Sequence, residues 1–178
     1  MNAAGLIRDI KGWYDEGDGG AMKSHELILD LLQSTDQPFS REQYAPGHIT
    51  ATALVVNESS DAVLLVFHKR LERWLLPGGH VEPDDATIID AARREAIEET
   101  SVQLDPGYEP SIDGFDVHGI PSNGKEPYHL HHDILVRLRA SSHVIAASPE
   151  SREVRWATFR NIERYNLPRN ILFRFLGI

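Results

Sequence analysis

The stretch from residue 76 to residue 102, LPGGHVEPDDATIIDAARREAIEETSV, constrains the fold more than any other part of the chain. It predicts the end of a strand, a glycine turn and then a helix over residues 86–100. Glu98 and Glu99 follow Glu95 by three and four residues, which places all three carboxylates on roughly one side of the helix. Like charges at this spacing repel by about 0.2–0.5 kcal/mol per pair, and negative charge near a helix C-terminus is also unfavourable. A bound divalent cation would remove both costs, so the pattern favours a metal site.

The same helix has a simpler interpretation as a solvated surface held by salt bridges. Asp90 and Arg94 form one i,i+4 pair, and Arg94 and Glu98 form another. Two observations weigh against this interpretation. Glu95 lies beside the apolar stripe that begins at Ile88, and a strand and a Pro-Gly-Gly turn come directly before the helix. We therefore favour metal binding by these carboxylates.

The remaining composition narrows the class of protein. With 178 residues, of which 41% are hydrophobic, the chain is long enough for one domain and a small appendage. Its apolar runs are too short for a membrane span, and we expect no signal peptide. The absence of cysteine excludes disulfides and thiolate chemistry and agrees with a cytoplasmic protein. A net charge of −9 argues against broad nucleic-acid binding, but a phosphorylated small molecule can still bind where metal ions screen the repulsion.

Helical periodicity over residues 3–14 and 21–34 predicts an N-terminal pair of helices, separated by a Gly-Asp-Gly-Gly turn. A polar connector with two prolines follows over residues 35–47. We expect residues 1–47 to form a helical extension, packed on the main domain or on the second subunit of a homodimer, because they are too few for an independent core. The main domain then spans residues 48–178.

The main domain combines β-branched runs with one strongly helical stretch. Asp84 or Asp85 is expected as the N-cap of the helix at 86–100, and a helical C-terminus over 159–176 is expected to be interrupted before Pro168. The strands are expected over residues 49–56, 62–68, 74–76, 112–120, 129–138 and 153–157. A mixed β-sheet sandwiched between helices, an α/β (α+β) fold, is the most economical architecture for this order.

The stretch 76–102 resembles the signature of the Nudix hydrolase family, Gx5Ex7REUxEExGU, in which U is a bulky aliphatic residue. The Pro-Gly-Gly at residues 77–79 matches its entry, REAIEE at residues 94–99 matches its core, and Val102 matches its last aliphatic position. This resemblance implies a Nudix-type sheet between helices. It also implies a hydrolase that cleaves the diphosphate linkage of a nucleoside diphosphate joined to another group. The implied cofactor is Mg²⁺ or Mn²⁺, and the implied partner is a small nucleotide-type molecule.

The sequence departs from the family pattern at four places. The spacing from Gly79 to the box arginine is one residue longer, so the first box Glu falls on Asp85 or on Ala86, and Asp85 is the one able to replace it. Ala96 takes an aliphatic position. Ser101 takes the place of the box glycine, so it must adopt a left-handed conformation or end the helix differently. These departures keep a second function open, a catalytically weak or inactive module that binds nucleotides.

The resemblance also implies roles for the box residues. Glu95 and Glu99, one helical turn apart, are the implied primary metal ligands. Glu98 is a further ligand or the base that polarises water. The glycine turn would let the backbone carbonyl of Gly79 approach the metal. Arg94 would orient the box loop and the glutamates rather than contact the substrate.

Residues 129–133, with the sequence HLHHD, have the most unusual local composition outside the box. In a strand, His129, His131 and Asp133 share one face, so His131 and Asp133 are candidate substrate-binding residues. Three interpretations stay open: a transition-metal site, a polar strand that lines the substrate cleft, or hydrogen-bonded structural histidines.

Further side chains are weaker candidates. Arg70 lies close in sequence to the glycine turn and is a candidate for substrate phosphates, although plain surface is the simpler interpretation. Trp74 either stacks on a base or packs in the core. Glu150 or Glu153, before the last strand, is a candidate for an additional carboxylate near the metal, as is Asp85.

Overall fold

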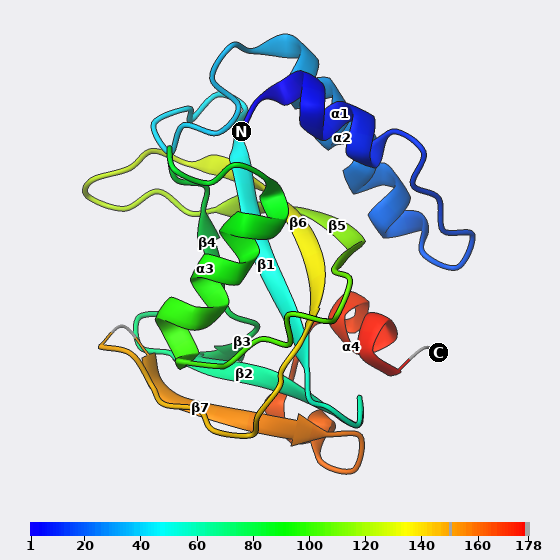
Figure 1. Ribbon diagram of the computed structural model, residues 1–178. Coiled ribbons are helices and arrows are strands. Elements are labelled where there is room, and N and C mark those ends of the chain that lie inside the picture. The colour runs from blue at the N-terminus through cyan, green and yellow to red at the C-terminus, as the bar shows by residue number, and fades with distance from the viewer. Residues whose placement is uncertain (150, 177–178) are drawn as a thin grey trace.

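A mixed β-sheet forms the centre of the molecule, as the sequence predicts (Figure 1). The computed structural model describes residues 1–149 and 151–176. The seven strands are β1 (Gly47–Val56), β2 (Ala62–His68), β3 (Arg73–Leu75), β4 (Gly78–His80), β5 (Ser111–Ile120), β6 (His129–Arg139) and β7 (Ser151–Thr158). They follow the order β3-β2-β1-β6-β5, with β4 paired to β1 and β7 paired to β2. The β1–β6 pair is parallel and the other pairs are antiparallel.

Helices cover both faces of the sheet, and the side-chain alternation of β1 and β6 divides the core between these faces. Three helices, α1 (Ala3–Ile10), α2 (Gly19–Ser34) and α3 (Ile88–Thr100), pack on the face that carries Ile49, Ala51 and Ile134. The 3-10 turn η1 (Ile162–Tyr165) and α4 (Arg169–Leu176) pack on the opposite face, against Leu54 and Leu135. None of the described helices combines the length and the apolar character that a membrane span needs.

The two N-terminal helices pack on the sheet of their own chain. The sequence predicts packing either on the main domain or on a second subunit, and the structure shows the first. Ser24 of α2 accepts a hydrogen bond from the Val117 N–H of β5 at 3.2 Å. The ring of Trp13 meets Phe115 of β5 edge-on, with ring centroids 4.8 Å apart. The extension therefore shares the main hydrophobic core rather than forming a separate body.

The predicted ends of the N-terminal helices are wrong by a few residues, each for a local reason. The first helix ends at Ile10, earlier than predicted, because Gly12 follows and glycine is a poor helix former. The second helix begins earlier than predicted, because the Asp18 carboxylate accepts the Ala21 N–H and caps it. At the other end of the chain, the predicted break before Pro168 is confirmed, with η1 on one side and α4 on the other.

Two features of the box differ from the sequence prediction. The predicted N-cap of α3 at Asp84 or Asp85 is wrong, because Thr87 caps the helix. Thr87 Oγ1 accepts the Asp90 N–H, and Asp90 Oδ2 accepts the Thr87 N–H, both at 3.1 Å. The predicted glycine turn is also wrong, since residues 78–80 form strand β4, which pairs with β1.

Candidate active site

Close contact between β4 and α3 depends on Gly79 and Glu95. Gly79 lies opposite Ala51 of β1 and faces α3, so a Cβ at this position would lie 2.6 Å from Glu95 Oε1. A side chain at residue 79 would therefore displace the Glu95 carboxylate. The Gly78 N–H donates to Glu99 Oε2 at 2.9 Å. The short strand thus contacts two of the box glutamates.

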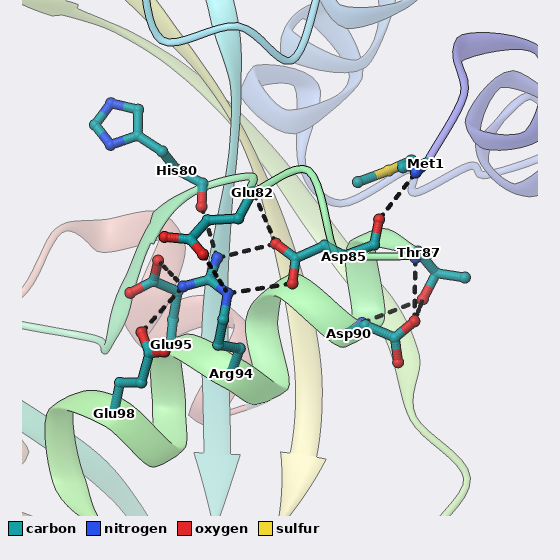
Figure 2. Close-up of polar contacts among 9 residues, drawn as sticks. All are labelled: Met1, His80, Glu82, Asp85, Thr87, Asp90, Arg94, Glu95 and Glu98. Atoms are coloured by element: carbon teal, nitrogen blue, oxygen red, sulfur yellow. Dashed lines mark hydrogen bonds and ion pairs between the residues drawn. The ribbon is translucent and has the colours of Figure 1, made fainter.

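Arg94 is the centre of the polar network in Figure 2. Its Nε and Nη2 donate to the two carboxylate oxygens of Asp85 at 3.1 and 2.9 Å. Nη2 also donates to the His80 carbonyl at 2.8 Å, and Nη1 donates to Glu95 Oε1 at 2.8 Å and to Glu98 Oε2 at 3.1 Å. The guanidinium therefore joins the loop before α3, strand β4 and two glutamates into one unit.

Asp85, and not Ala86, faces the box arginine. Asp85 is only 5% exposed, whereas Ala86 is exposed. The Asp85 carboxylate also accepts the Glu82 N–H at 2.8 Å. Burial raises the pKa of Asp85, but the hydrogen bonds from Arg94 and Glu82 outweigh burial and hold this pKa below its ordinary value. Asp85 is therefore a charged partner of Arg94 at neutral pH.

The glutamates of α3 lie in different environments. The Glu95 side chain is 14% exposed, and burial raises the pKa of its carboxyl although Arg94 opposes this shift. The Glu98 side chain is 58% exposed. Within the described ranges, Glu95, Glu98 and Glu99 do not form a group whose ligand atoms all lie within 4.8 Å of one another. Arg94 Nη1 instead binds one oxygen of Glu95 and one of Glu98.

The polar face of β6 lies beside matching polar residues of β1. Asp133 Oδ1 accepts a hydrogen bond from Thr50 Oγ1 at 3.0 Å, and its Oδ2 accepts one from Thr52 Oγ1 at 2.7 Å. Burial raises the pKa of Asp133. His131 lies on the same face, two residues earlier. A substrate-binding role for His131 and Asp133 stays a prediction.

Sequence reasoning missed His48 of β1 and His80 of β4, which the sheet brings next to His131. The ring centroids lie 4.9 Å apart for His48 and His131, 5.0 Å for His48 and His80, and 5.3 Å for His80 and His131. Burial lowers the pKa of all three, to about 4 for His80 and about 2 for His131, so the rings are neutral at pH 7. The pairing of strands brings them together, and no local sequence pattern joins residues 48, 80 and 131.

The weaker candidates lie apart from the network around Arg94. Trp74 packs against the smaller core cluster and meets the ring of Tyr165 edge-on, at 5.1 Å between centroids. Arg70 is exposed in the turn after β2. Glu153 of β7 forms an ion pair with an arginine of the same strand. Glu150 lies outside the described residues. Substrate or metal contacts by these side chains stay predictions.

The segment before β7 runs along the C-terminal end of α3, close to the box glutamates. The Ala146 N–H donates to the Thr100 carbonyl at 2.8 Å, and the Ser148 N–H donates to the Glu99 carbonyl at 3.2 Å. Directly after Thr100, Ser101 ends the helix in the left-handed conformation, with φ of 53°. Of the two outcomes that the sequence predicts for Ser101, a left-handed conformation or a different helix end, the structure shows the left-handed conformation.

Comparison with solved structures shows the same fold in several Nudix proteins. The NUDIX domain of Shewanella oneidensis NrtR, complexed with ADP ribose, is 19% identical with a TM-score of 0.55, and the match covers 83% of this chain and 93% of that one. A NUDIX-family hydrolase from Clostridium perfringens is 24% identical with a TM-score of 0.53, covering 73% and 94%.

A third solved structure is a bifunctional NMN adenylyltransferase/ADP ribose pyrophosphatase from Francisella tularensis, complexed with AMP and a manganese ion. It is 22% identical with a TM-score of 0.54, and the match covers 87% of this chain but only 47% of the longer protein. At identities this low, the structural similarity shows a shared fold alone.

Sequence comparison establishes the family. A search of curated proteins finds no match to this chain. The NUDIX domain model, in contrast, matches residues 46–175, which include the box and every strand of the sheet. The chain therefore belongs to the Nudix family, as the stretch from residue 76 to residue 102 predicts.

Proposed function

We propose that the protein is a metal-dependent pyrophosphohydrolase that cleaves the diphosphate linkage of a nucleoside diphosphate joined to another group. The observation that carries this proposal is the network in which Asp85 fixes Arg94, while β4 contacts Glu95 and Glu99. Family membership supports it. So does the similar fold of the Francisella tularensis protein, which is described as an ADP ribose pyrophosphatase.

The residues of the box fit a hard divalent cation such as Mg²⁺ or Mn²⁺. Glu95, Glu98 and Glu99 offer carboxylate oxygens, which these cations prefer. Gly79 has no Cβ to fill the space beside Glu95. Burial raises the pKa of Glu95, an unfavourable effect that a nearby cation would reverse. When bound, the cation would supply charge neutralisation on the diphosphate and activation of the attacking water.

The side chains of the box would position this chemistry. Glu95 and Glu99 would hold the cation, with the backbone carbonyl of Gly79 beside them. Glu98, which is exposed where Glu95 and Glu99 are half-buried, would be a further ligand or accept the proton of the attacking water. Arg94 would act as a positioning residue, because its donors are already directed at Asp85, His80 and the glutamates.

The proposal is tested by turnover of a panel of nucleoside diphosphate derivatives, dinucleoside polyphosphates and nucleoside triphosphates with Mg²⁺ or Mn²⁺. Release of nucleoside monophosphate or phosphate is measured for the wild type and for Glu99→Gln. The glutamine keeps an oxygen that accepts the Gly78 N–H, so the fold should persist while a negative ligand is lost. We expect kcat to fall about 10²–10³-fold, the size of effect seen when one transition-state contact is removed.

The matched control is Glu58→Gln, which removes one exposed glutamate from the turn between β1 and β2. This variant should keep the wild-type rate. Full activity of Glu99→Gln, or no turnover of any compound by the wild type with metal present, would contradict the proposal.

A second candidate function is nucleotide binding without cleavage. The observation that favours it is the contact of Arg94 Nη1 with both Glu95 and Glu98, which keeps these carboxylates on the arginine. A Nudix domain of similar fold is described in complex with ADP ribose. Metal-dependent thermal stabilisation by a nucleotide, with no product formed over the same period, would favour this function over hydrolysis.

A further inference from the structure

Three histidines from three different strands meet on the sheet face opposite α3. His48 of β1 and His131 of β6 are direct partners in the parallel ladder, and His80 of β4 lies opposite Thr50, on the face that His48 shares. Each of the three rings offers a nitrogen, and these nitrogens all lie within 4.8 Å of one another. In Figure 2 the His80 ring points away from Arg94, although its carbonyl accepts from that residue. The histidine trio is therefore separate from the box glutamates.

The hydrogen bonding of His48 leaves one ring nitrogen available to a ligand. Its Nδ1 lies 3.1 Å from the Gln43 carbonyl oxygen. A carbonyl can only accept, so Nδ1 carries the proton and Nε2 presents its lone pair. His48 Nε2 is buried and has no hydrogen-bond partner. A buried polar atom without a partner costs about 1–3 kcal/mol, so this one requires an explanation.

A metal ion would satisfy this nitrogen, and the local arrangement is the one that metal-binding histidines use. In such sites one ring nitrogen binds the metal while the other donates to a backbone carbonyl or carboxylate, which fixes the tautomer and the ring orientation. The Gln43 carbonyl takes this second role for His48. His129, whose ring lies 5.1 Å from that of His48, shows the same pattern with the Pro127 carbonyl at 2.9 Å.

The ligand set selects the kind of ion. Imidazole nitrogen suits zinc, copper, nickel and cobalt, whereas magnesium prefers hard oxygen ligands. The carboxylates around the trio already have partners. Asp133 accepts from two threonines, and Asp116 contacts His118 at 2.8 Å. Glu126, whose charge acts on His48 and His80, accepts from Asn123 and pairs with Arg41. Zinc sites with three protein ligands leave a fourth position open for water or for a ligand. We infer that His48, His80 and His131 form a binding site for a zinc-class transition metal ion, distinct from the carboxylate site on α3.

The inference does not rest on the proposed function, and its test measures metal binding without substrate. Protein without a histidine tag, stripped of metal, is titrated with Zn²⁺ against a chromogenic chelator, and Co²⁺ binding is followed by visible absorption. We expect the wild type to bind Zn²⁺. His80→Gln and His131→Gln should each weaken this binding by more than about tenfold, since even second-layer changes cost about 10–100-fold at such sites.

Two controls locate the ion. His143→Gln removes an exposed histidine of the segment after β6, outside the trio, whose ring contacts Trp156, and this variant should bind Zn²⁺ as the wild type does. Glu99→Gln should also keep Zn²⁺ binding, because it alters only the carboxylate site. Loss of Zn²⁺ binding in Glu99→Gln would assign the ion to the box and overturn the inference.

A second measurement guards against misfolded variants. Thermal unfolding followed by circular dichroism, without metal, should give a cooperative transition for each histidine variant. Added Zn²⁺ should raise the Tm of the wild type but not that of His80→Gln, whose half-buried side chain can be replaced with little disturbance. Equal Zn²⁺ affinity in the wild type and both trio variants, or no Zn²⁺ and Co²⁺ binding by the wild type, overturns the site.

Discussion

At the scale of single residues, the box is held by Arg94 rather than by direct contacts among its acidic groups. The guanidinium donates to Asp85, Glu95 and Glu98, and to a backbone carbonyl of β4. The planar fork of an arginine satisfies the two oxygens of Asp85 at once, which the single ammonium of a lysine cannot do. The sequence predicts repulsion between the neighbouring carboxylates of Glu95 and Glu98. The positive charge of the Arg94 guanidinium, which contacts both, offsets this repulsion.

An alanine at residue 79 should disturb the Glu95 carboxylate. In Gly79→Ala, the new Cβ would lie 2.6 Å from Glu95 Oε1 and 2.8 Å from its Cδ, so the carboxylate must move. Because Glu95 is the proposed metal ligand, we expect kcat to fall by more than about tenfold while stability changes little, since a flexible side chain absorbs the clash. The measurements are steady-state kinetics with Mg²⁺ and urea unfolding.

The control for this change is Gly124→Ala, where a Cβ would meet nothing within 4 Å. This variant should match the wild type in both measurements. If Gly79→Ala keeps the wild-type kcat, the close approach of β4 to Glu95 has no part in the activity.

At the scale of elements, the C-terminal end of α3 carries a strained residue. Ser101 has φ of 53° and ψ of 22°, a left-handed conformation in which a Cβ is unfavourable by about 1–2 kcal/mol. Ser101→Gly removes this strain but adds freedom to the unfolded chain, so we expect a net gain of about 0.5–1 kcal/mol in the free energy of unfolding. Thermal unfolding should show a Tm higher by about 1–4 °C.

Ser101→Ala is the matched control, because it keeps the Cβ and hence the strain. It should show no gain. An equal rise of the Tm in both variants would mean that the backbone conformation is not the cause.

The elements themselves were predictable where periodicity was strong, and unpredictable where tertiary contacts set the backbone. The runs of β-branched residues gave β1, β2, β5 and β6, and the apolar stripe gave α3. At Gly78-Gly79 the sequence predicts a turn instead of strand β4, because glycine pairs are typical of turns. A Cβ at residue 78 would lie 2.7 Å from the Ala51 carbonyl oxygen. The absence of a side chain at residues 78 and 79 lets β4 pack closely against β1 and Glu95 of α3. The predicted caps at Asp84 and Asp85 and the observed cap, Thr87 with Asp90 three residues on, are all local patterns.

The two proposed sites, the box and the histidine trio, differ in how far the sequence predicts them. The box could be predicted because its residues are contiguous and their spacing carries the chemistry. The histidine trio could not, because His48 and His80 each stand alone in the sequence and become neighbours of His131 only through the register of β1 with β4 and β6. Only the histidine-rich start of β6 gave a local signal.

At the scale of the whole molecule, the N-terminal extension and the C-terminal helix are joined by one side chain. Arg174 of α4 donates to Asp15 and to Asp18 in the connection between α1 and α2, the latter at 3.0 Å. Its guanidinium also lies over the Trp13 ring, 5.2 Å from the centroid. The family model begins at residue 46, yet this contact makes the preceding helices part of the same folded unit.

This junction predicts a large effect for Arg174→Met. The arginine side chain is 10% exposed, so its removal leaves the carboxylates of Asp15 and Asp18 without this cation in a partly buried place. We expect a loss of about 2–3 kcal/mol in the free energy of unfolding at pH 7, below the range for fully buried pairs because both carboxylates keep some contact with solvent. Urea unfolding measures the loss, and Arg160→Met, at an exposed position, should show almost none.

The pH dependence of this loss tests its electrostatic origin. A hydrogen bond from the Gly17 N–H, with Arg174 contributing, holds the pKa of Asp15 below its ordinary value. A carboxyl with a lowered pKa stabilises the fold above its unfolded pKa, near 4, and this contribution disappears as the pH falls through the folded pKa. The difference between wild type and Arg174→Met should therefore shrink as the pH falls below about 4. A difference that stays constant down to pH values of about 3 would assign the effect to lost packing on Trp13 instead.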